Sequence, residues 1–210
     1  MADPIEELAH FFARLPGIGP RQAKRFVFYL LSTAPAERLQ FAEHIAALGK
    51  DVRQCPECMR FANGAGPTCS YCKDSARDDA LLMVVEKDQD LAAVERAGNY
   101  KGRYFVLGGV LTLSGKGAIR EKDLVRRVEK YLKNNVSAKG GSASGGKEIV
   151  LALSATSEGE HTADRVRELL APYRDKITLS TLGRGLATGS ELEYSDAETL
   201  RAALVNRKQT

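Results

Sequence analysis

The N-terminal part of the chain carries apolar side chains at the three- and four-residue spacing of amphipathic helices. Asp3 is a good N-cap, and Pro4 at the first helical position strengthens this helix start. Two later periods also open at a proline. The pattern predicts three helices, over residues 4–14, 20–33 and 35–50. Residues 1–54 are therefore expected to form a small helical module.

The pattern changes after residue 80, where short apolar runs alternate with helical periods. The runs predict four strands, over residues 81–85, 104–107, 149–153 and 177–179. The intervening periods predict helices over residues 90–97, 121–134 and 160–170, and a capping box from Ser195 to Glu198 opens a last helix that ends near residue 206. Continuous apolar runs are typical of buried parallel strands. We expect an α/β domain with a mostly parallel sheet over residues 79–175, followed by a C-terminal segment over residues 176–210.

Composition adds that the chain is globular. Its 210 residues correspond to one or two domains, with 43% hydrophobic and 28% charged residues. It lacks a run of 18 apolar residues, and its start carries Asp3, Glu6 and Glu7 without a continuous apolar stretch. We therefore expect a soluble protein without a secretory signal that stays in the cytoplasm and does not contact membranes. The stretch 137–146, rich in glycine and serine, is expected to be a mobile surface loop.

The net charge of +4 is modest but unevenly distributed. Residues 8–36 hold four arginines or lysines and no acid, and residues 101–139 hold ten against three acids. These stretches could face a polyanion, or they could simply solvate helix faces. In the helix predicted from residue 121, the basic side chains that share roughly one side are Lys122, Arg126, Lys130 and Lys133.

Four cysteines form the strongest local motif. Cys55 and Cys58 are separated by two residues, as are Cys69 and Cys72, with ten residues between the pairs. Such spacing places four thiolates at the corners of a tetrahedron, without room for a water ligand. We predict one structural Zn²⁺ per chain, in a module over residues 55–78. Two disulfides or a redox-active pair are the alternatives.

A second motif lies between the first two predicted helices. Gly17 and Gly19 permit a tight turn that exposes amide groups at the start of the next helix, where the dipole favours a phosphate. Arg21 and Arg25 lie four residues apart on one face of that helix. An ordinary hairpin of two helices would also use these glycines. The residues resemble the helix-hairpin-helix motif of DNA-binding proteins, which binds backbone phosphates without reading bases.

Acidic residues follow two of the predicted strands. Glu86, Asp88 and Asp90 follow one, and Glu158 and Glu160 follow another. This arrangement resembles the toprim domain of topoisomerases and primases, whose Glu and Asp-x-Asp elements bind Mg²⁺.

The second toprim element is degenerate, because the Asp-x-Asp position holds Ser154, Ala155 and Thr156. Asp88 could equally be an N-cap, and Ser157 with Glu160 fits a capping box. A P-loop is absent, because the nearest candidate, residues 109–117, has the wrong glycine spacing.

In this order the hairpin, the cysteine module, the toprim-like domain and a C-terminal Gly183-Arg184-Gly185 segment resemble the RecR family of bacterial recombination mediators, across essentially the whole chain. The resemblance implies a ring-forming oligomer, usually a dimer of dimers, that closes around double-stranded, gapped or single-stranded DNA at the nucleoid. It also implies cooperation with RecO, and in some pathways RecF, to load RecA at single-stranded gaps.

Carried over by residue, the DNA contacts fall on Arg21 and Arg25, and we add Lys24 of the same helix. The family's acidic RecO-binding positions fall on Glu86, Asp90, Glu158 and Glu160. The family's Walker-B-like C-terminal stretch is altered over residues 185–190, which puts a nucleotide contact there in doubt.

The leading hypothesis is a DNA clamp without catalytic residues. The alternatives are a Mg²⁺-dependent primase or nuclease that uses Glu86, Asp88, Asp90 and Glu158, and a scaffold that binds a protein partner but no DNA.

Overall fold

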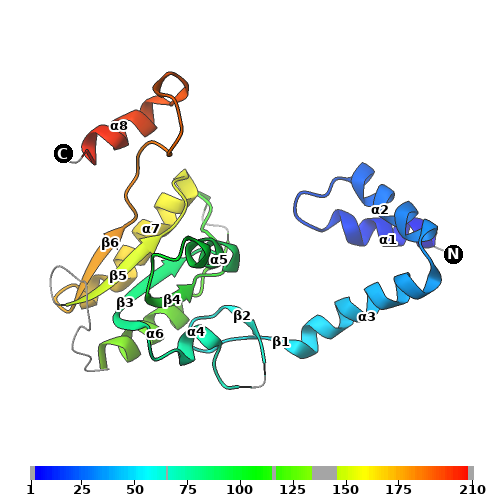
Figure 1. Cartoon of the computed structure of the whole chain (residues 1–210), viewed down its shortest axis with the longest axis horizontal. Coiled ribbons are helices and arrows are strands. Elements are labelled where there is room, and N and C mark those ends of the chain that lie inside the picture. The colour runs from blue at the N-terminus through cyan, green and yellow to red at the C-terminus, as the bar shows by residue number, and fades with distance from the viewer. Residues whose placement is uncertain (1–2, 65, 115–116, 134–145, 208–210) are drawn as a thin grey trace. The chain divides into compact units, whose positions relative to one another are not determined.

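The structure is a computed structural model that describes residues 3–64, 66–114, 117–133 and 146–207 (Figure 1). The chain divides into two compact units, Met1–Arg53 and Gln54–Thr210. Within the described ranges, no helix has the length and apolar character needed to cross a membrane. The predicted loop at residues 137–146 lies outside the described residues, except for Gly146.

The first unit contains the three predicted helices, α1 (Pro4–Ala13), α2 (Pro20–Ser32) and α3 (Pro35–Asp51). Asp3 caps α1 as predicted, because its Oδ1 accepts the N–H of Ile5 at 3.0 Å. The first two helices form a hairpin whose small core is Ala9, Ala23 and Val27. None of the residues of α3 is buried. The unit therefore leaves much apolar surface exposed.

The second unit is built on a parallel sheet with the order β4-β3-β5-β6. Its strands are β3 (Asp78–Val85), β4 (Gly102–Val106), β5 (Lys147–Ala152) and β6 (Ile177–Thr181). Val84 pairs with Phe105 on one side and with Leu151 on the other. All three side chains are buried, which explains why these strands read as continuous apolar runs.

Three helices cover the sheet, and they are α5 (Asp88–Ala97), α6 (Glu121–Lys133) and α7 (Ser157–Leu170). Right-handed connections place α6 and α7 on one face and α5 on the other (Figure 1). Arg165 of α7 joins the two neighbours, with a bidentate ion pair to Glu121 of α6 at 2.9 and 3.0 Å. The predicted α/β fold is confirmed.

The remaining elements flank this sheet. A two-stranded sheet pairs β1 (Val52–Gln54) with β2 (Phe61–Asn63), and short helices follow at α4 (Ser70–Lys73), Ala171–Tyr173 and Leu192–Tyr194. The chain continues into α8 (Ala197–Val205). Its N-cap is Asp196, not Ser195, because the Asp196 carboxylate accepts the N–H groups of Glu198 and Thr199. The predicted capping box from Ser195 is therefore wrong by one residue.

The caps of two other helices also differ from the prediction. Thr156, not Ser157, caps α7, because its hydroxyl accepts the N–H of Gly159 at 3.1 Å. Asp88 does not cap α5, which begins after Lys87. In each case the residue just before the predicted cap has the extended backbone that an N-cap needs.

Candidate metal centre and nucleic-acid interface

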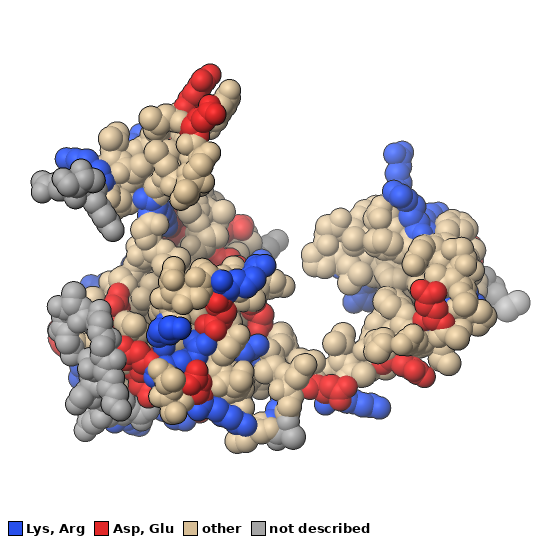
Figure 2. Space-filling model, viewed as in Figure 1, with Lys and Arg blue, Asp and Glu red and all other residues tan. Residues whose placement is uncertain are grey.

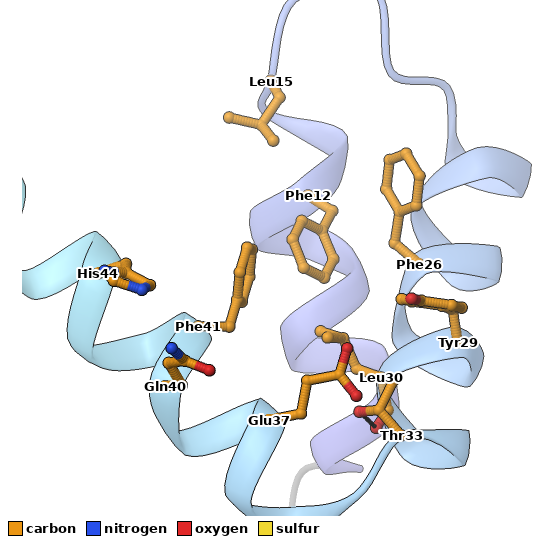
Figure 3. Close-up of a pocket in the computed structure, with 10 residues that line it drawn as sticks. All are labelled: Phe12, Leu15, Phe26, Tyr29, Leu30, Thr33, Glu37, Gln40, Phe41 and His44. Atoms are coloured by element: carbon orange, nitrogen blue, oxygen red, sulfur yellow. Dashed lines mark hydrogen bonds between the residues drawn. The ribbon is translucent and has the colours of Figure 1, made fainter.

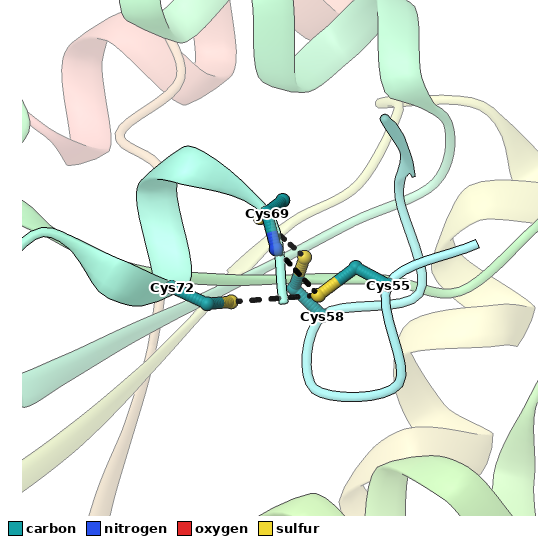
Figure 4. Close-up of side chains that lie close together, drawn as sticks. All are labelled: Cys55, Cys58, Cys69 and Cys72. Carbon is teal, nitrogen blue, oxygen red and sulfur yellow. Dashed lines mark hydrogen bonds between the residues drawn. The ribbon is translucent and has the colours of Figure 1, made fainter. Parts of the chain in front are cut away.

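The four cysteines of the sequence motif come together in the structure (Figure 4). Their sulfur atoms all lie within 4.8 Å of one another. The Sγ atoms of Cys58 and Cys69 are 3.5 Å apart, and those of Cys55 and Cys72 are 3.9 Å apart. A tetrahedron with metal–sulfur bonds near 2.3 Å has sulfur–sulfur edges of about 3.8 Å. The arrangement therefore fits a metal ion with four thiolate ligands.

Two local structures aim these sulfurs at one point. The turn after β1 brings Cys55 and Cys58 together, and Met59 closes it with a positive φ of 60°. The Met59 N–H donates to the carbonyl of Cys55 at 2.8 Å. Cys69 is the N-cap of α4 and Cys72 lies within this helix. The Cys69 N–H points at the sulfur of Cys55, at 3.4 Å, as it would toward a thiolate.

The surroundings of the sulfurs favour a bound cation. All four cysteines are free, and three of them are buried. The pKa of the Cys58 thiol is raised by its hydrogen bond with Cys69, by a second one with Cys72 and by burial. A nearby positive charge is therefore needed to keep all four sulfurs ionised as thiolates. Across the described residues, this is the only group of three or more histidine, cysteine or acidic side chains close enough to share an ion. The cluster can thus bind a metal, and its four protein ligands leave no position for substrate.

The cysteine knuckle, residues 55–72, is fixed to the end of the sheet. The N–H of Val106, the last residue of β4, donates to the Cys58 carbonyl at 2.8 Å. Arg120 donates from Nη1 to the carbonyls of Val106, at 2.9 Å, and Met59, at 3.3 Å. The Met59 side chain belongs to the main hydrophobic core. A metal bound here would therefore also order the adjoining end of the sheet.

The predicted phosphate site lies at the turn between α1 and α2. Gly17 has a φ of +78°, and Gly19 is the N-cap of α2 without a side chain to bond the first amides. Arg21 and Arg25 are exposed, and neither forms an ion pair with a described residue. Lys24 differs, because its Nζ lies 2.6 Å from Glu6 of α1. In Figure 2, lysine and arginine side chains project from the helical unit near α2, and acidic side chains lie elsewhere on the surface of the same unit.

The predicted acidic residues at the strand ends do not converge on one point. Glu86 is only 8% exposed, and its Oε1 accepts the N–H of Ser154 at 2.5 Å. Asp90 accepts the N–H of Lys87 at 2.9 Å, inside the first turn of α5. Glu160 forms an ion pair with Arg184. These carboxylates are thus engaged in separate internal contacts.

The basic row of α6 is exposed but partly neutralised. Arg126 pairs with Asp123 at 2.5 Å, and Lys130 pairs with Glu57 of the cysteine knuckle at 2.5 Å. Lys122 and Lys133 are exposed at the two ends of the helix. The row therefore offers less free charge than the sequence suggests.

An apolar groove on the helical unit was not predicted from the sequence (Figure 3). It measures about 590 Å³, and aromatic residues from all three helices point into it, among them Phe12, Phe26 and Phe41. In the same unit, Phe11 is 64% exposed and Leu48 is 61% exposed. A sequence signal existed, because α3 carries apolar residues although residues 1–54 predict no further helix to cover them.

Comparison with known proteins gives matches along the whole chain. Family models described as "RecR, helix-hairpin-helix", "Toprim domain" and "RecR, C-terminal" match residues 5–48, 80–182 and 185–208. Recombination protein RecR from Prochlorococcus marinus (strain MIT 9303) is 38% identical over 94% of this chain and 96% of its own. Those from Carboxydothermus hydrogenoformans and Latilactobacillus sakei are 36% and 33% identical over 99% of this chain, and over 97% and 98% of their own. The chain belongs to the RecR family of recombination proteins.

Proposed function

We propose that this chain is a non-catalytic, DNA-binding mediator of recombinational repair. Its similarity over nearly the full length to relatives named recombination protein carries the proposal. The protein forms a clamp around DNA and assists RecO and RecF in loading RecA at single-stranded gaps. It does so in the bacterial cytoplasm, at the nucleoid.

DNA binds first at the hairpin of the helical unit. The exposed Arg21 and Arg25 lie beside the uncapped amides at the start of α2, so both charge and hydrogen-bond donors face one phosphate path. Lys24 contributes when its bond to Glu6 opens, because both side chains are about half exposed. None of these groups reads a base edge, so binding is indifferent to sequence and includes duplex, gapped and single-stranded DNA.

One zinc ion per chain occupies the cysteine knuckle and stabilises it. Its ligands are Cys55, Cys58, Cys69 and Cys72, and four sulfur ligands favour zinc over hard cations such as Mg²⁺. The knuckle has two three-residue strands and a four-residue helix, so it needs the metal to hold its shape.

A homo-oligomer, a tetramer built from dimers, forms the ring of the clamp. The apolar groove of the helical unit supports this assembly, because a contiguous exposed surface of aromatic and aliphatic side chains is typical of a protein interface. Arg21 and Arg25 do not line the groove, so subunit contacts there would leave both arginines available to DNA.

RecO contacts the acidic residues near the sheet. Glu158 and Glu160 are partly exposed at the start of α7. Glu158 can meet a basic partner directly, and Glu160 can do so when its ion pair with Arg184 opens. Glu86 and Asp90 support that surface from within, through their bonds to the backbone of Ser154 and Lys87.

Retention on DNA tests the clamp. The zinc-loaded protein is expected to stay on a closed gapped circle and to slide from the same DNA after linearisation. Arg21→Ala/Arg25→Ala should lose retention, whereas Lys50→Ala/Arg53→Ala, a double charge removal at exposed positions in the same unit, should not. Removal of one phosphate-binding cation reduces the slope of log affinity against log salt by about 0.9 on duplex DNA. Equal retention of both double variants would contradict the proposal.

A further inference from the structure

A polar groove of about 530 Å³ lies between the cysteine knuckle and the end of the sheet. Its walls come from the knuckle, from the start of α5 and from the segment after β4. The side chains that give it chemical character are Arg60, Phe61, Tyr71, Lys87, Asp88 and Arg120.

Positive charge dominates this groove. The Arg60 guanidinium lies over the Tyr71 ring, 4.3 Å from its centre, and the buried Nε of Arg60 has no hydrogen-bond acceptor among the described residues. Lys87 is exposed at the rim and Arg120 lies against Gly108. The one carboxylate, that of Asp88, is engaged, because it accepts the N–H of Phe61 at 2.9 Å. An anion would therefore meet three cations against one carboxylate here, and Arg60 and Lys87 are the two cations that do not donate to a backbone carbonyl of a described residue as Arg120 does.

Phe61 adds a flat apolar surface beside these cations. Its side chain is 56% exposed, although its backbone is held by the pairing of β2 with β1 and by Asp88. The ring is therefore largely exposed, while the backbone that carries it is held in place. An aromatic ring next to arginine and lysine is the combination that binds single-stranded nucleic acid, since the ring stacks on a base and the cations hold the phosphate.

We propose that this groove binds one unpaired nucleotide of single-stranded DNA, with the base stacked on Phe61 and the phosphate held by Arg60 and Lys87. A base inside a duplex has both faces covered by its neighbours, so only an unpaired strand offers a free face. The inference rests on the proposed DNA binding. It assigns the preference of the protein for single-stranded gaps to a surface other than the hairpin. The volume of the groove lies within the range found for small-molecule pockets.

The test compares binding of full-length, zinc-loaded protein to labelled oligothymidine and to a duplex of equal length, by fluorescence anisotropy. Phe61→Ala should weaken oligothymidine binding about tenfold and leave duplex binding unchanged. Phe61→Trp should restore it, and Tyr194→Ala, which removes another exposed aromatic side chain of the same unit, should have no effect. Lys87→Ala should reduce the salt slope for oligothymidine by about 0.7, whereas Lys101→Ala, at another exposed lysine, should not.

Zinc content and melting temperature of each variant establish that it is folded. Unchanged oligothymidine affinity in Phe61→Ala overturns the inference and leaves a protein partner as the occupant. An equal loss of affinity for oligothymidine and for duplex in Phe61→Ala also overturns the inference, because the loss of stacking on an unpaired base cannot weaken duplex binding. Inorganic phosphate that competes as well as thymidine monophosphate would identify an anion site without stacking and also contradict it. Failure of the wild type to bind either DNA would instead refute the proposed function.

Discussion

Replacement of Glu86 tests whether the acidic end of the sheet holds the fold together or performs chemistry. Its side chain is 8% exposed, and its carboxylate accepts the Ser154 N–H at 2.5 Å, joining the ends of β3 and β5 across 68 positions of sequence. A hydrogen bond to a charged group contributes about 1.5–3 kcal/mol. Alanine would remove this acceptor and leave a partly buried donor unpaired, so we expect a loss of about 2–3 kcal/mol.

Glutamine keeps an acceptor at the same place, so Glu86→Gln should lose only about 1 kcal/mol. For a folding unit of this size, each kcal/mol shifts the melting temperature by about 2–4 °C. Glu86→Ala should therefore melt about 5–10 °C below the wild type and Glu86→Gln only a few degrees below. Glu158→Gln, at a nearby and more exposed acid, serves as the control and should leave the melting temperature unchanged.

Thermal unfolding of the zinc-loaded protein can be followed by near-ultraviolet circular dichroism. Tyr104 and Tyr131 are buried in the sheet unit and report on its packing. In parallel, nicked and single-stranded DNA are incubated with Mg²⁺ or Mn²⁺. DNA cleavage or primer synthesis by the wild type, abolished in a Glu86→Gln variant of unchanged stability, would refute the structural role and establish the enzyme alternative.

Three further predictions concern the sheet unit. Gly159→Ala should destabilise it by about 1–3 kcal/mol in urea unfolding, because the new Cβ would lie 2.0 Å from the carbonyl oxygen of Ser154; a wild-type midpoint would contradict this. Cys58→Ser should abolish binding of one zinc per chain, measured by chelator competition, and lower the melting temperature; full zinc content would exclude the cluster as the site. Hydrogen bonds from Arg77 hold the pKa of Glu95 below the ordinary value of a glutamate. The contribution of Glu95 to stability is therefore complete above that ordinary pKa and is lost as the pH falls through the lowered one; Glu95→Gln should be less stable than wild type at pH 7, and a difference in stability that failed to narrow on acidification would contradict the linkage.

Local signals in the sequence were sufficient to predict most elements. The apolar run before Glu86 predicted a buried strand, and the observed β3 buries Leu82 to Val85. The paired cysteine motifs carried their own geometry, because a metal site needs ligands at fixed spacing and little else. Helix starts were predicted well where a proline follows the cap, as at Asp3, and missed by one residue where two polar residues compete, as at Ser195 and Asp196.

Contacts between distant segments were beyond the reach of sequence patterns. The bond from Glu86 to Ser154 depends on β3 and β5 being neighbours, which the order of strands along the chain does not state. The position of Phe61 beside Lys87 depends on how the cysteine knuckle packs against the sheet. The apolar groove arises because α3 packs little of its surface within its own unit, and helical periodicity alone does not tell which face is covered.

At the acidic end of the sheet, two of the acids that could bind a metal ion are hydrogen-bonded to the protein backbone. Ser154 and Thr156 bond each other through their hydroxyls, at 3.0 Å, where a hard cation would require carboxylates. Glu86 is committed to the backbone of Ser154, and Asp88 to the N–H of Phe61 in the cysteine knuckle. Two acids that could face an ion thus hold protein segments instead, and one of them fixes the strand that carries an exposed aromatic ring. Metal binding of the toprim kind would need carboxylates at positions 154 and 156 and also the release of Glu86 from Ser154. The backbone contacts of Glu86 and Asp88 therefore favour the proposed binding surface and oppose a catalytic one.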